Sequence, residues 1–265
     1  MYDKLKKMFM QRSNRVCIYG APGVGKTHAV AELAKHREIV YLDTDGNIEP
    51  FEMLSESQLG NITYVPLMDV KMGGSMTAVF HEAMENGKIV VCENHGLSGC
   101  LACRKAKDPL IVVDLLSLKD ENKILVLDSF SPLLMAAAAD MRRATGLTTL
   151  DSVKIQQMGI MSNRLNPILF FLTHLPCDVL VLAHRKNVNT DLDSKNTKPP
   201  FYYPNLGTVP ASETGVSYFK AVIGVESYKK FYLNPPVAGY YCLNRGSKPT
   251  QGESLGSVLL NLFNN

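Results

Sequence analysis

The sequence predicts an α/β fold in which a mostly parallel sheet is flanked by helices on both faces. Three observations lead to this prediction. Short apolar runs of strand length alternate with segments of helical spacing along the chain. A glycine-rich loop joins the first of these runs to the first helical segment. A carboxylate or an imidazole follows three of the later runs, and the carboxyl ends of parallel strands are where α/β sheets bind ligands.

The first half of the chain begins with the apolar run "VCIY", which ends at Gly20 and is short enough for a buried strand. The segment "KTHAVAELAKH" then alternates apolar and polar residues at helical spacing. The turn signal "DTDGN" closes the next apolar run. We expect strands at 16–19, 39–42 and 89–92, and helices at 26–36 and 70–85.

The second half contains the apolar runs "KILVLDSF" and "DVLVLAH", which predict buried strands at 123–130 and 178–184. Pro167 is expected to bend a long helix. Residues 185–215 have little periodicity and are predicted to form a functional or mobile loop. We expect helices at 132–143, 155–175 and 254–263. Short antiparallel strands are expected at one edge of the sheet, within 218–227, 229–234 and 238–244.

The chain's 265 residues suit one large domain, and we expect a single domain over 1–265 with a small insert at 88–108. No stretch reaches about 18 consecutive apolar residues, which predicts that no segment spans a membrane. The N-terminus lacks the long apolar segment of a secretion signal, so we expect a cytoplasmic protein. The formal net charge of +3 permits a nucleic-acid partner without indicating one, because only clustered basic residues are evidence for it.

Residues 20–27, "GAPGVGKT", match the pattern G-x-x-x-x-G-K-[ST] at every position. Glycines let the backbone N–H groups of such a loop turn inward and hold phosphate oxygens, and the following helix points its positive end at the same place. Lys26 would reach the β- and γ-phosphates, and the Thr27 hydroxyl would bind Mg²⁺. The predicted nucleotide-binding residues are Gly20, Ala21, Pro22, Gly23, Val24, Gly25, Lys26, Thr27 and His28.

A second group for Mg²⁺ and a group that activates water are expected where neighbouring strands end. Asp128 follows "KILVL" and is the predicted acid that holds the metal or its water. Asp43 and Asp45 leave the second strand on the same side, so either could face the γ-phosphate. His184 ends another strand and could sense a phosphate by hydrogen bonding. The alternatives are that Asp128 is a surface acid, that Asp43 and Asp45 belong to a solvated turn, and that His184 is a structural histidine.

The segment "CENHGLSGCLAC" places Cys92, His95, Cys100 and Cys103 in the pattern C-x₂-H-x₄-C-x₂-C. Two close pairs of thiolate and imidazole ligands can hold one tetrahedral zinc ion. Four protein ligands leave no open coordination position, so such a site would be structural. The alternatives are reduced cysteines packed in a small loop and, less favoured because of the histidine, an iron–sulfur cluster. The other cysteines, Cys17, Cys177 and Cys242, fall in or beside expected strands and are interpreted as core residues.

The order of "GAPGVGKT", "YLDTDG", "ILVLDS" and "VLVLAH" resembles that of the RecA-like P-loop ATPases, and more closely that of phage AAA-type ATPases related to single-strand annealing and recombination proteins. The resemblance implies catalytic roles for Lys26, Asp45, Asp128 and His184. Asp45 takes the place of the family's usual glutamate, which polarises the attacking water, and is one methylene shorter. The resemblance also implies a homo-oligomer with sites at subunit interfaces, to which Arg142, Arg143 or Arg185 could contribute.

Single-stranded DNA is the partner that the resemblance implies, bound by loops after the Asp128 strand's helix and after the His184 strand. The corresponding residues here are Arg142, Arg143, Arg185 and Lys186. Aromatic residues at 201–203 accompany the second pair, and basic residues beside aromatic ones can hold a backbone and stack bases. A flexible solvated loop is the alternative.

These observations support one main hypothesis and two others. The main one is an ATPase that uses ATP, Mg²⁺ and a structural zinc ion and acts on single-stranded DNA in phage recombination or replication, in the host cytoplasm. The second is a module that binds nucleotide, recruits a replication partner and hydrolyses little, which the short Asp45 favours. A small-molecule kinase ranks last, because the sequence lacks an arginine-rich lid.

Overall fold

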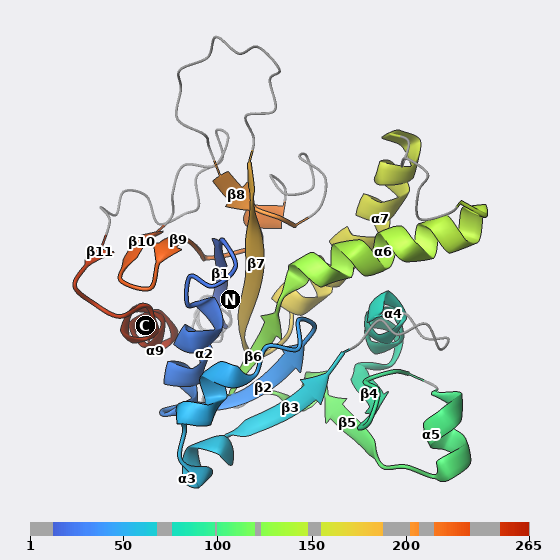
Figure 1. The fold of residues 1–265 in the computed structure, drawn as a ribbon, viewed down its shortest axis with the longest axis horizontal. Helices are drawn as coiled ribbons and strands as arrows, with labels where there is room; N and C mark the ends of the chain where they lie inside the picture. Colours follow the sequence, from blue (N-terminus) through green and yellow to red (C-terminus); the bar gives the residue numbers. More distant parts are fainter. Residues whose placement is uncertain are drawn as a thin grey trace, which may run out of the picture.

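The structure is a computed structural model that describes residues 13–67, 76–98, 100–119, 123–147, 155–187, 202–206, 215–233 and 250–264. A nine-stranded sheet forms its centre, in the order β11-β10-β9-β1-β7-β6-β2-β3, with β8 paired to β7 (Figure 1). Six neighbouring strands of the sheet are parallel: β9 (Ala221–Ser227), β1 (Arg15–Gly20), β7 (Asp178–Asn187), β6 (Lys123–Asp128), β2 (Glu38–Asp43) and β3 (Ile62–Pro66). Three short strands pair antiparallel: β10 (Lys230–Leu233), β11 (Thr250–Gln251) and β8 (Tyr202–Pro204).

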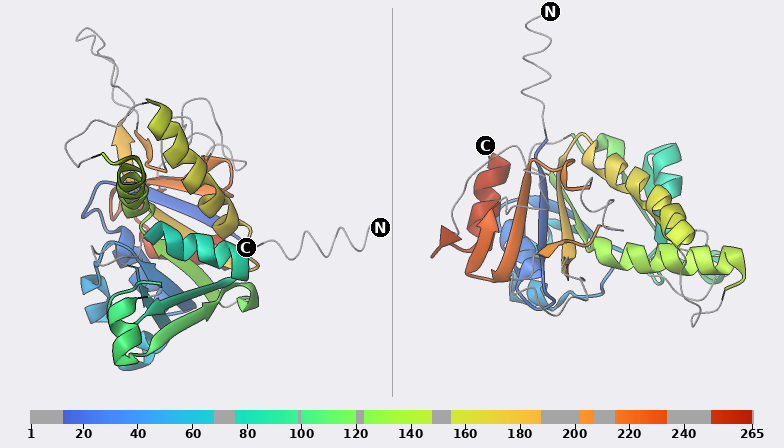
Figure 2. Two further views of the ribbon diagram at one scale, coloured as in Figure 1. Left: turned by 90° about the vertical axis from the view of Figure 1, so that its right-hand side faces the viewer. Right: turned by 90° about the horizontal axis from the view of Figure 1, so that it is seen from above.

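Helices cover both faces of this sheet (Figure 2). One face packs against α2 (Lys26–Ala34), α9 (Leu255–Asn264) and the 3-10 helix η1 (Glu49–Met53). The other packs against α4 (Met76–Asn86), α6 (Phe130–Thr145) and α7 (Ile155–Thr173). No helix in the described parts of the chain is long and apolar enough to cross a membrane.

The strand sequences are apolar throughout because the sheet is covered on both faces. In β1, Val16 and Ile18 belong to the core on the α2 side, and Cys17 and Tyr19 belong to the core on the α6 side. The same alternation, repeated from strand to strand, produces two separate hydrophobic layers.

The order of the parallel strands brings polar residues from distant parts of the sequence to one edge. Strand β7 lies between β1 and β6, and β2 lies on the other side of β6. In the register of these pairs Gly20 aligns with His184, and Asp43 aligns with Asp128. All four residues therefore lie at the carboxyl edge, where ligands bind in α/β sheets.

Helix α9 holds α2 in place on its face of the sheet. A Cβ at Gly256 would overlap the Glu32 side chain, so the two helices approach closely at this point. The Ser254 hydroxyl donates to Glu32 Oε2 over 2.8 Å, and Arg37, just after α2, donates to Asn264 Oδ1 over 3.3 Å.

A second, two-stranded sheet stands apart from the first; its hairpin contains the segment 88–108 expected as an insert and extends beyond it to Asp114. It consists of β4 (Lys88–Cys92) and β5 (Leu110–Asp114), paired antiparallel. Helix α5 (Leu101–Ala106) lies between them in sequence, and the 3-10 helix η2 (Leu115–Ser117) follows. Ile89, Val91 and Val113 point into the core on the α6 side, so the hairpin is attached to the domain by its inner face.

The expected elements are found with some corrections. The sequence reading missed β3, β5 and the short helix α3 (Glu56–Leu59). Strand β9 runs parallel to β1, so the expectation that all the C-terminal strands are antiparallel is wrong for this one. The long connection after β7 allows the chain to return to the opposite end of the sheet, as a parallel neighbour requires. Strand β7 extends to Asn187, and β8 lies within the expected loop. The expected strand at 238–244 and the start of the helix at 70–85 lie outside the described residues.

Candidate functional site

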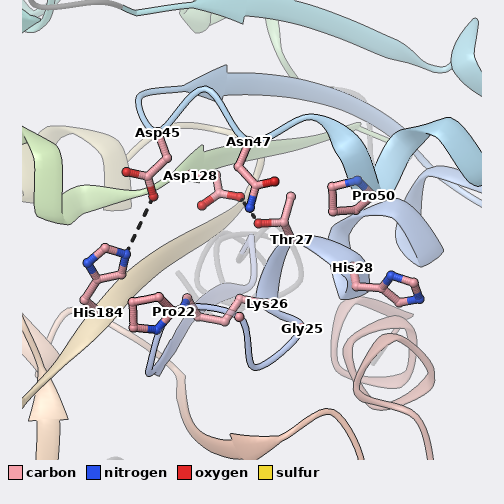
Figure 3. Close-up of a pocket in the computed structure, with 11 residues that line it drawn as sticks. Pro22, Gly25, Lys26, Thr27, His28, Asp45, Asn47, Pro50, Asp128 and His184 are labelled. Atoms are coloured by element: carbon pink, nitrogen blue, oxygen red, sulfur yellow. Dashed lines mark hydrogen bonds and ion pairs between the residues drawn. The ribbon is translucent and has the colours of Figure 1, made fainter.

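A cavity of about 440 Å³ opens at the carboxyl edge of the sheet. The loop after β1 forms one wall, and the loop after β2 lies opposite it (Figure 3). The cavity is lined by Pro22, Gly23, Gly25, Lys26, Thr27, His28, Asp45, Asn47, Pro50, Asp128 and His184. All four predicted catalytic residues and six of the nine predicted nucleotide-binding residues are therefore in this lining. Gly20, Ala21 and Val24 belong to the same loop but are not among the lining residues.

The glycine-rich loop, residues 20–27, has a shape that only glycine permits at two positions. Gly25 has a φ of 92°, and a Cβ there would lie 2.7 Å from the ring of Tyr228. A Cβ at Gly20 would lie 2.6 Å from the carbonyl oxygen of Val225. The loop is thus pressed against β9 and the turn that follows it, and α2 begins immediately after Gly25. Gly25, Lys26 and Thr27 line the cavity, so the positive end of α2 lies at the cavity wall, as anion binding requires.

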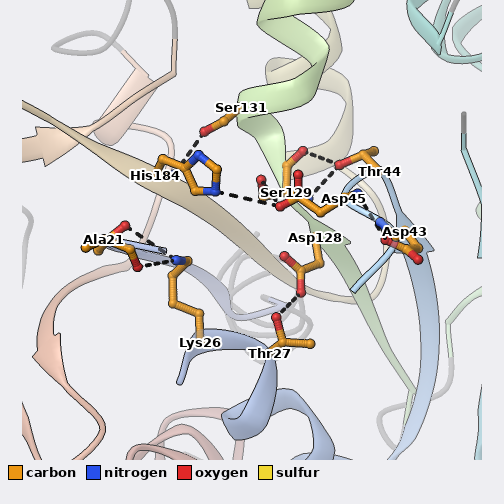
Figure 4. Close-up of polar contacts among 12 residues, drawn as sticks. Ala21, Lys26, Thr27, Asp43, Thr44, Asp45, Asp128, Ser129, Ser131 and His184 are labelled. Atoms are coloured by element: carbon orange, nitrogen blue, oxygen red, sulfur yellow. Dashed lines mark hydrogen bonds and ion pairs between the residues drawn. The ribbon is translucent and has the colours of Figure 1, made fainter. Parts of the chain in front are cut away.

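Lys26 is buried beside this loop. Its Nζ donates to the carbonyl oxygen of Ala21 over 2.9 Å and to that of Gly20 over 3.4 Å (Figure 4). Burial lowers the pKa of Lys26, while the nearby Asp128 and Asp45 act to raise it. An ammonium group at this place in the cavity wall can bind an anionic ligand held by the loop.

Asp128 is a buried carboxylate held by hydroxyl groups. Thr27 Oγ1 donates to Asp128 Oδ2 over 2.6 Å, and the Tyr41 hydroxyl donates to the same oxygen over 2.8 Å. Burial raises the pKa of Asp128 to about 6, although both hydroxyl bonds and Lys26 act to lower it. A hydroxyl and a carboxylate in contact at the cavity wall are oxygen ligands of the type that Mg²⁺ takes. These two residues therefore fit the predicted magnesium site.

The two acids after β2 face different surroundings. Asp43 is buried, and its Oδ1 accepts from the N–H groups of Asp45 and Gly46 over 3.0 and 2.7 Å. Its Oδ2 accepts from the Tyr64 hydroxyl over 2.8 Å. Asp43 is not among the residues that line the cavity, whereas Asp45 is. Of the two residues left open by the sequence, Asp45 is the one placed to face a ligand.

Asp45 and His184 approach each other across the end of the cavity. His184 Nε2 lies 3.7 Å from Asp45 Oδ2, and the Ser129 hydroxyl donates to the same Asp45 oxygen over 2.9 Å. Burial and the charge of Lys26 lower the pKa of His184, and Asp45 opposes them. The His184 backbone N–H donates to Ser131 Oγ over 2.9 Å, which fixes the strand end against α6.

Several supporting residues were missed from the sequence. Thr44 Oγ1 lies 2.6 Å from both the N–H and the carbonyl oxygen of Ser129, and the Thr44 N–H donates to Asp128 O over 2.7 Å. Tyr41 looks like an apolar strand residue in the sequence, yet its hydroxyl reaches Asp128. Asn47 and Pro50 line the cavity, and their place within the four residues after "DTDG" was the available signal.

The predicted zinc ligands come together in the hairpin insert. We call residues 92–98 and 100–103 the knuckle. The ligand atoms of Cys92, His95, Cys100 and Cys103 all lie within 4.8 Å of one another. His95 Nδ1 is 2.9 Å from Cys103 Sγ, 3.6 Å from Cys100 Sγ and 3.9 Å from Cys92 Sγ. In a tetrahedral zinc site, ligand atoms about 2.0–2.3 Å from the ion lie roughly 3.5–3.8 Å apart. The distances from His95 to Cys100 and Cys92 fit this spacing, and the distance to Cys103 is shorter. Cys17 and Cys177 are buried as expected, and Cys242 lies outside the described residues.

The predicted DNA-binding residues fall on two elements. Arg142 and Arg143 lie in the last turn of α6, where Arg143 pairs with Asp140 over 2.6 Å. Arg185 and Lys186 lie on β7, and in its pairing with β8 Lys186 aligns with Tyr203. Burial lowers the pKa of Lys186. In Figure 1 α6 ends well away from the end of β7. The rest of the two predicted DNA-binding loops, at 148–151, 188–201 and 207–214, lies outside the described residues.

Comparison with known proteins assigns the chain to a family. A solved ATPase from the type III secretion system of pathogenic bacteria is similar to the chain at 16% identity and a TM-score of 0.42. The match covers 80% of this chain and 50% of that one, so the chain spans half the length of that structure. No curated protein matches the sequence. The model of the AAA domain family matches residues 12–211, which contain every residue of the cavity lining. The chain therefore belongs to the AAA domain family and has the nucleotide-binding fold of P-loop ATPases.

Proposed function

We propose that the protein is a Mg²⁺-dependent ATPase. The most direct support is that one cavity is lined by all of the following residues: Lys26, Thr27, Asp128, Asp45 and His184. A phosphate-binding loop, a pair of metal-ligand oxygens and a further carboxylate beside an imidazole are the parts that phosphoryl transfer to water requires.

Each side chain has one proposed role. Lys26 and the loop N–H groups bind the phosphates, and Thr27 and Asp128 hold Mg²⁺, which neutralises phosphate charge when bound. Asp45 orients the attacking water and accepts its proton. Its hydrogen bond from Ser129 restricts the carboxylate, which compensates in part for a side chain shorter than glutamate. His184 contacts the γ-phosphate, so the position of β7, the strand that carries His184, depends on whether this phosphate is bound.

ATP turnover measured with and without Mg²⁺ tests this proposal. Lys26→Ala should abolish nucleotide binding, and Asp45→Asn should keep binding while turnover falls about 10²- to 10⁴-fold. Glu85→Gln changes an exposed carboxylate on α4 that does not line the cavity, and it serves as the control. Retained nucleotide affinity in Lys26→Ala would contradict the phosphate-loop assignment. Full turnover in Asp45→Asn would contradict the role of Asp45.

We propose that ATP turnover is coupled to action on single-stranded DNA, in phage recombination or replication within the host cytoplasm. The support is the placement of Arg142 and Arg143 at the end of α6 and of Arg185 and Lys186 at the end of β7, both on elements that start at the catalytic edge or end there. Single-stranded DNA should stimulate ATP turnover, and its affinity should fall as salt rises, because phosphate contacts release counterions. An affinity independent of salt would argue against these residues.

Two further proposals complete this function. The knuckle binds a zinc ion, for which elemental analysis should find about one per chain. The protein works as a homo-oligomer, which sedimentation at several protein concentrations can test. A metal-free and fully folded preparation would contradict the first, and a monomer at all concentrations with nucleotide present would contradict the second.

A nucleotide-dependent binding module is the second candidate function. The observation that favours it is Asp45 itself, since an aspartate reaches less far into the cavity than a glutamate would. In that case ATP would bind at the same residues and alter the shape of the 43–47 loop, with turnover close to zero in the presence of DNA. Turnover measured beside binding separates the two functions.

A further inference from the structure

The knuckle lies directly against the end of strand β3. Gly96 has a φ of 60°, and a Cβ added there would overlap the carbonyl oxygen of Pro66 and lie 3.1 Å from Leu67 N. Its neighbour Leu97 is buried with Cys92 and Cys103 in a small apolar cluster. The backbone of the knuckle is therefore in contact with the Pro66–Leu67 peptide, without a side chain between them.

The same peptide is bonded to the loop that carries Asp45. The Leu67 N–H donates to Asp43 O over 2.7 Å, and Pro66 is the register partner of Asp43. The Tyr64 hydroxyl, from the same strand, donates to the Asp43 carboxylate over 2.8 Å. Strand β3 thus holds both the backbone and the side chain of Asp43.

Asp43 in turn shapes the cavity wall. Its Oδ1 accepts from the N–H groups of Asp45 and Gly46, which closes the turn from which the Asp45 side chain reaches the cavity. A continuous series of short contacts therefore runs from Gly96 through Pro66–Leu67 and Asp43 to Asp45.

We propose that a zinc ion bound by the knuckle positions the loop of Asp45 through this series of contacts. His95, a ligand, immediately precedes Gly96, so fixing the imidazole fixes the peptide that touches Pro66. Among the described residues, the apolar cluster of the knuckle comprises Cys92, Leu97, Cys103 and the partly buried Cys100. This is too little apolar surface to hold the turn without the ion. Gly96 and Asp43 are positioning residues, since neither lines the cavity.

The effect on ATP turnover rests on the proposed ATPase function, but the effect on the loop does not. Amide hydrogen exchange at Asp45 and Gly46 reports the loop directly, because both N–H groups are bonded to Asp43. When the zinc is removed from the full chain by a chelator, exchange at these two amides should become faster by about tenfold or more. Adding Zn²⁺ back should restore it.

Nucleotide affinity and turnover should separate in the same experiment. The glycine-rich loop is shaped by β9 and the turn after it, at Val225 and Tyr228, so ATP affinity should stay unchanged. Turnover should fall by about 10- to 100-fold, because a small misplacement of Asp45 costs that much. If the intact protein shows no turnover, the proposed function fails while the exchange measurement still decides this inference.

If the metal-free protein unfolds, a variant that keeps all four zinc ligands provides a second test of the same proposal. Gly96→Ala should bind zinc, yet its Cβ must push the knuckle away from Pro66. We expect faster exchange at Asp45 and Gly46 with unchanged zinc content. Gly252→Ala is the matched control, because this glycine also has a positive φ, of 99°, and a Cβ there would meet nothing within 4 Å. Equal exchange in the two variants, unchanged exchange in folded metal-free protein, or no uptake of Zn²⁺ would each overturn the proposal.

Discussion

The two loops that face each other across the cavity are built by different means. The glycine-rich loop, residues 20–27, takes its shape from backbone conformation and from the close approach of β9 and the turn that follows it. The loop opposite, residues 43–47, contains one glycine and is held by the side chains of Asp43 and Thr44 (Figures 3 and 4). The shape of the first loop therefore does not come from the residues opposite it. The second depends on β3, β6 and the insert.

This difference predicts that nucleotide affinity and ATP turnover respond to substitutions in different parts of the molecule. A loop defined by backbone N–H groups tolerates changes elsewhere, so nucleotide affinity should be robust to damage in the insert or the edge strand. A carboxylate held by successive hydrogen bonds is sensitive to each of them, so turnover should respond where affinity does not. Substitutions in the two loops can test that separation.

The largest effect is expected at Gly25. Gly25→Ala places a Cβ at a positive φ and against the Tyr228 ring, which should lower the free energy of unfolding by about 2–4 kcal/mol and abolish ATP binding. Gly23→Ala has a similar φ, of 75°, but its Cβ would meet nothing within 4 Å, so only about 1 kcal/mol should be lost. Chemical denaturation and titration with a fluorescent nucleotide measure both. Equal losses in the two variants would contradict the importance of the Tyr228 contact.

The next effect is expected at Asp43, in the opposite loop. Asp43→Ala leaves two N–H groups and the Tyr64 hydroxyl without their acceptor, which should cost about 2–3 kcal/mol of unfolding free energy. Turnover should fall far more than nucleotide affinity. Asp43→Asn keeps an acceptor oxygen and should recover part of both. Loss of affinity and turnover in equal measure would indicate that the two loops are not independent.

A smaller effect is expected at Thr44, which joins the loop to β6. Thr44→Val removes the hydrogen bonds of its hydroxyl with the backbone of Ser129 and should cost about 1–2 kcal/mol. Thr44→Ser retains the hydroxyl and is the control. Thermal unfolding of the three proteins gives the difference, and identical stability of the valine and serine variants would show that these bonds contribute nothing net.

The smallest effect is expected at Ser129. Ser129→Ala removes the one hydrogen bond from its hydroxyl to Asp45, so stability should fall by about 1 kcal/mol or less. Turnover should decrease severalfold with nucleotide affinity unchanged, because only the orientation of Asp45 is altered. Single-turnover measurements at saturating ATP isolate that step, and an unchanged rate would show that the Ser129 bond does not position the carboxylate.

The sequence predicted the glycine-rich loop well because its requirements are local. Glycine spacing, the lysine and the following helix all lie within one short segment. The positions of Asp128 and His184 followed from apolar runs that end in a polar residue, and their meeting at one edge follows from the parallel sheet.

The choice between Asp43 and Asp45 needed contacts that no local pattern contains. Asp43 ends β2 and Asp45 follows it, and the bonds of Asp43 with the Asp45 and Gly46 N–H groups and with the Tyr64 hydroxyl of β3 show which acid is turned away. Strand β3 itself was missed because "ITYVP" has two exposed residues and ends in proline, which hides the apolar run. Strand β5 was missed although its sequence, "LIVVD", is an unbroken apolar run, so in this case the sequence did contain the signal.

The contact between α9 and α2 has a practical consequence for protein engineering. The helix that begins at Lys26 rests on a helix more than two hundred residues later in the sequence, through Gly256 and the bond from Ser254 to Glu32. A fluorescent label or a fused domain attached within α9 would therefore disturb the glycine-rich loop itself. A label on α5, in the hairpin insert, would leave that loop alone and disturb only the opposite wall.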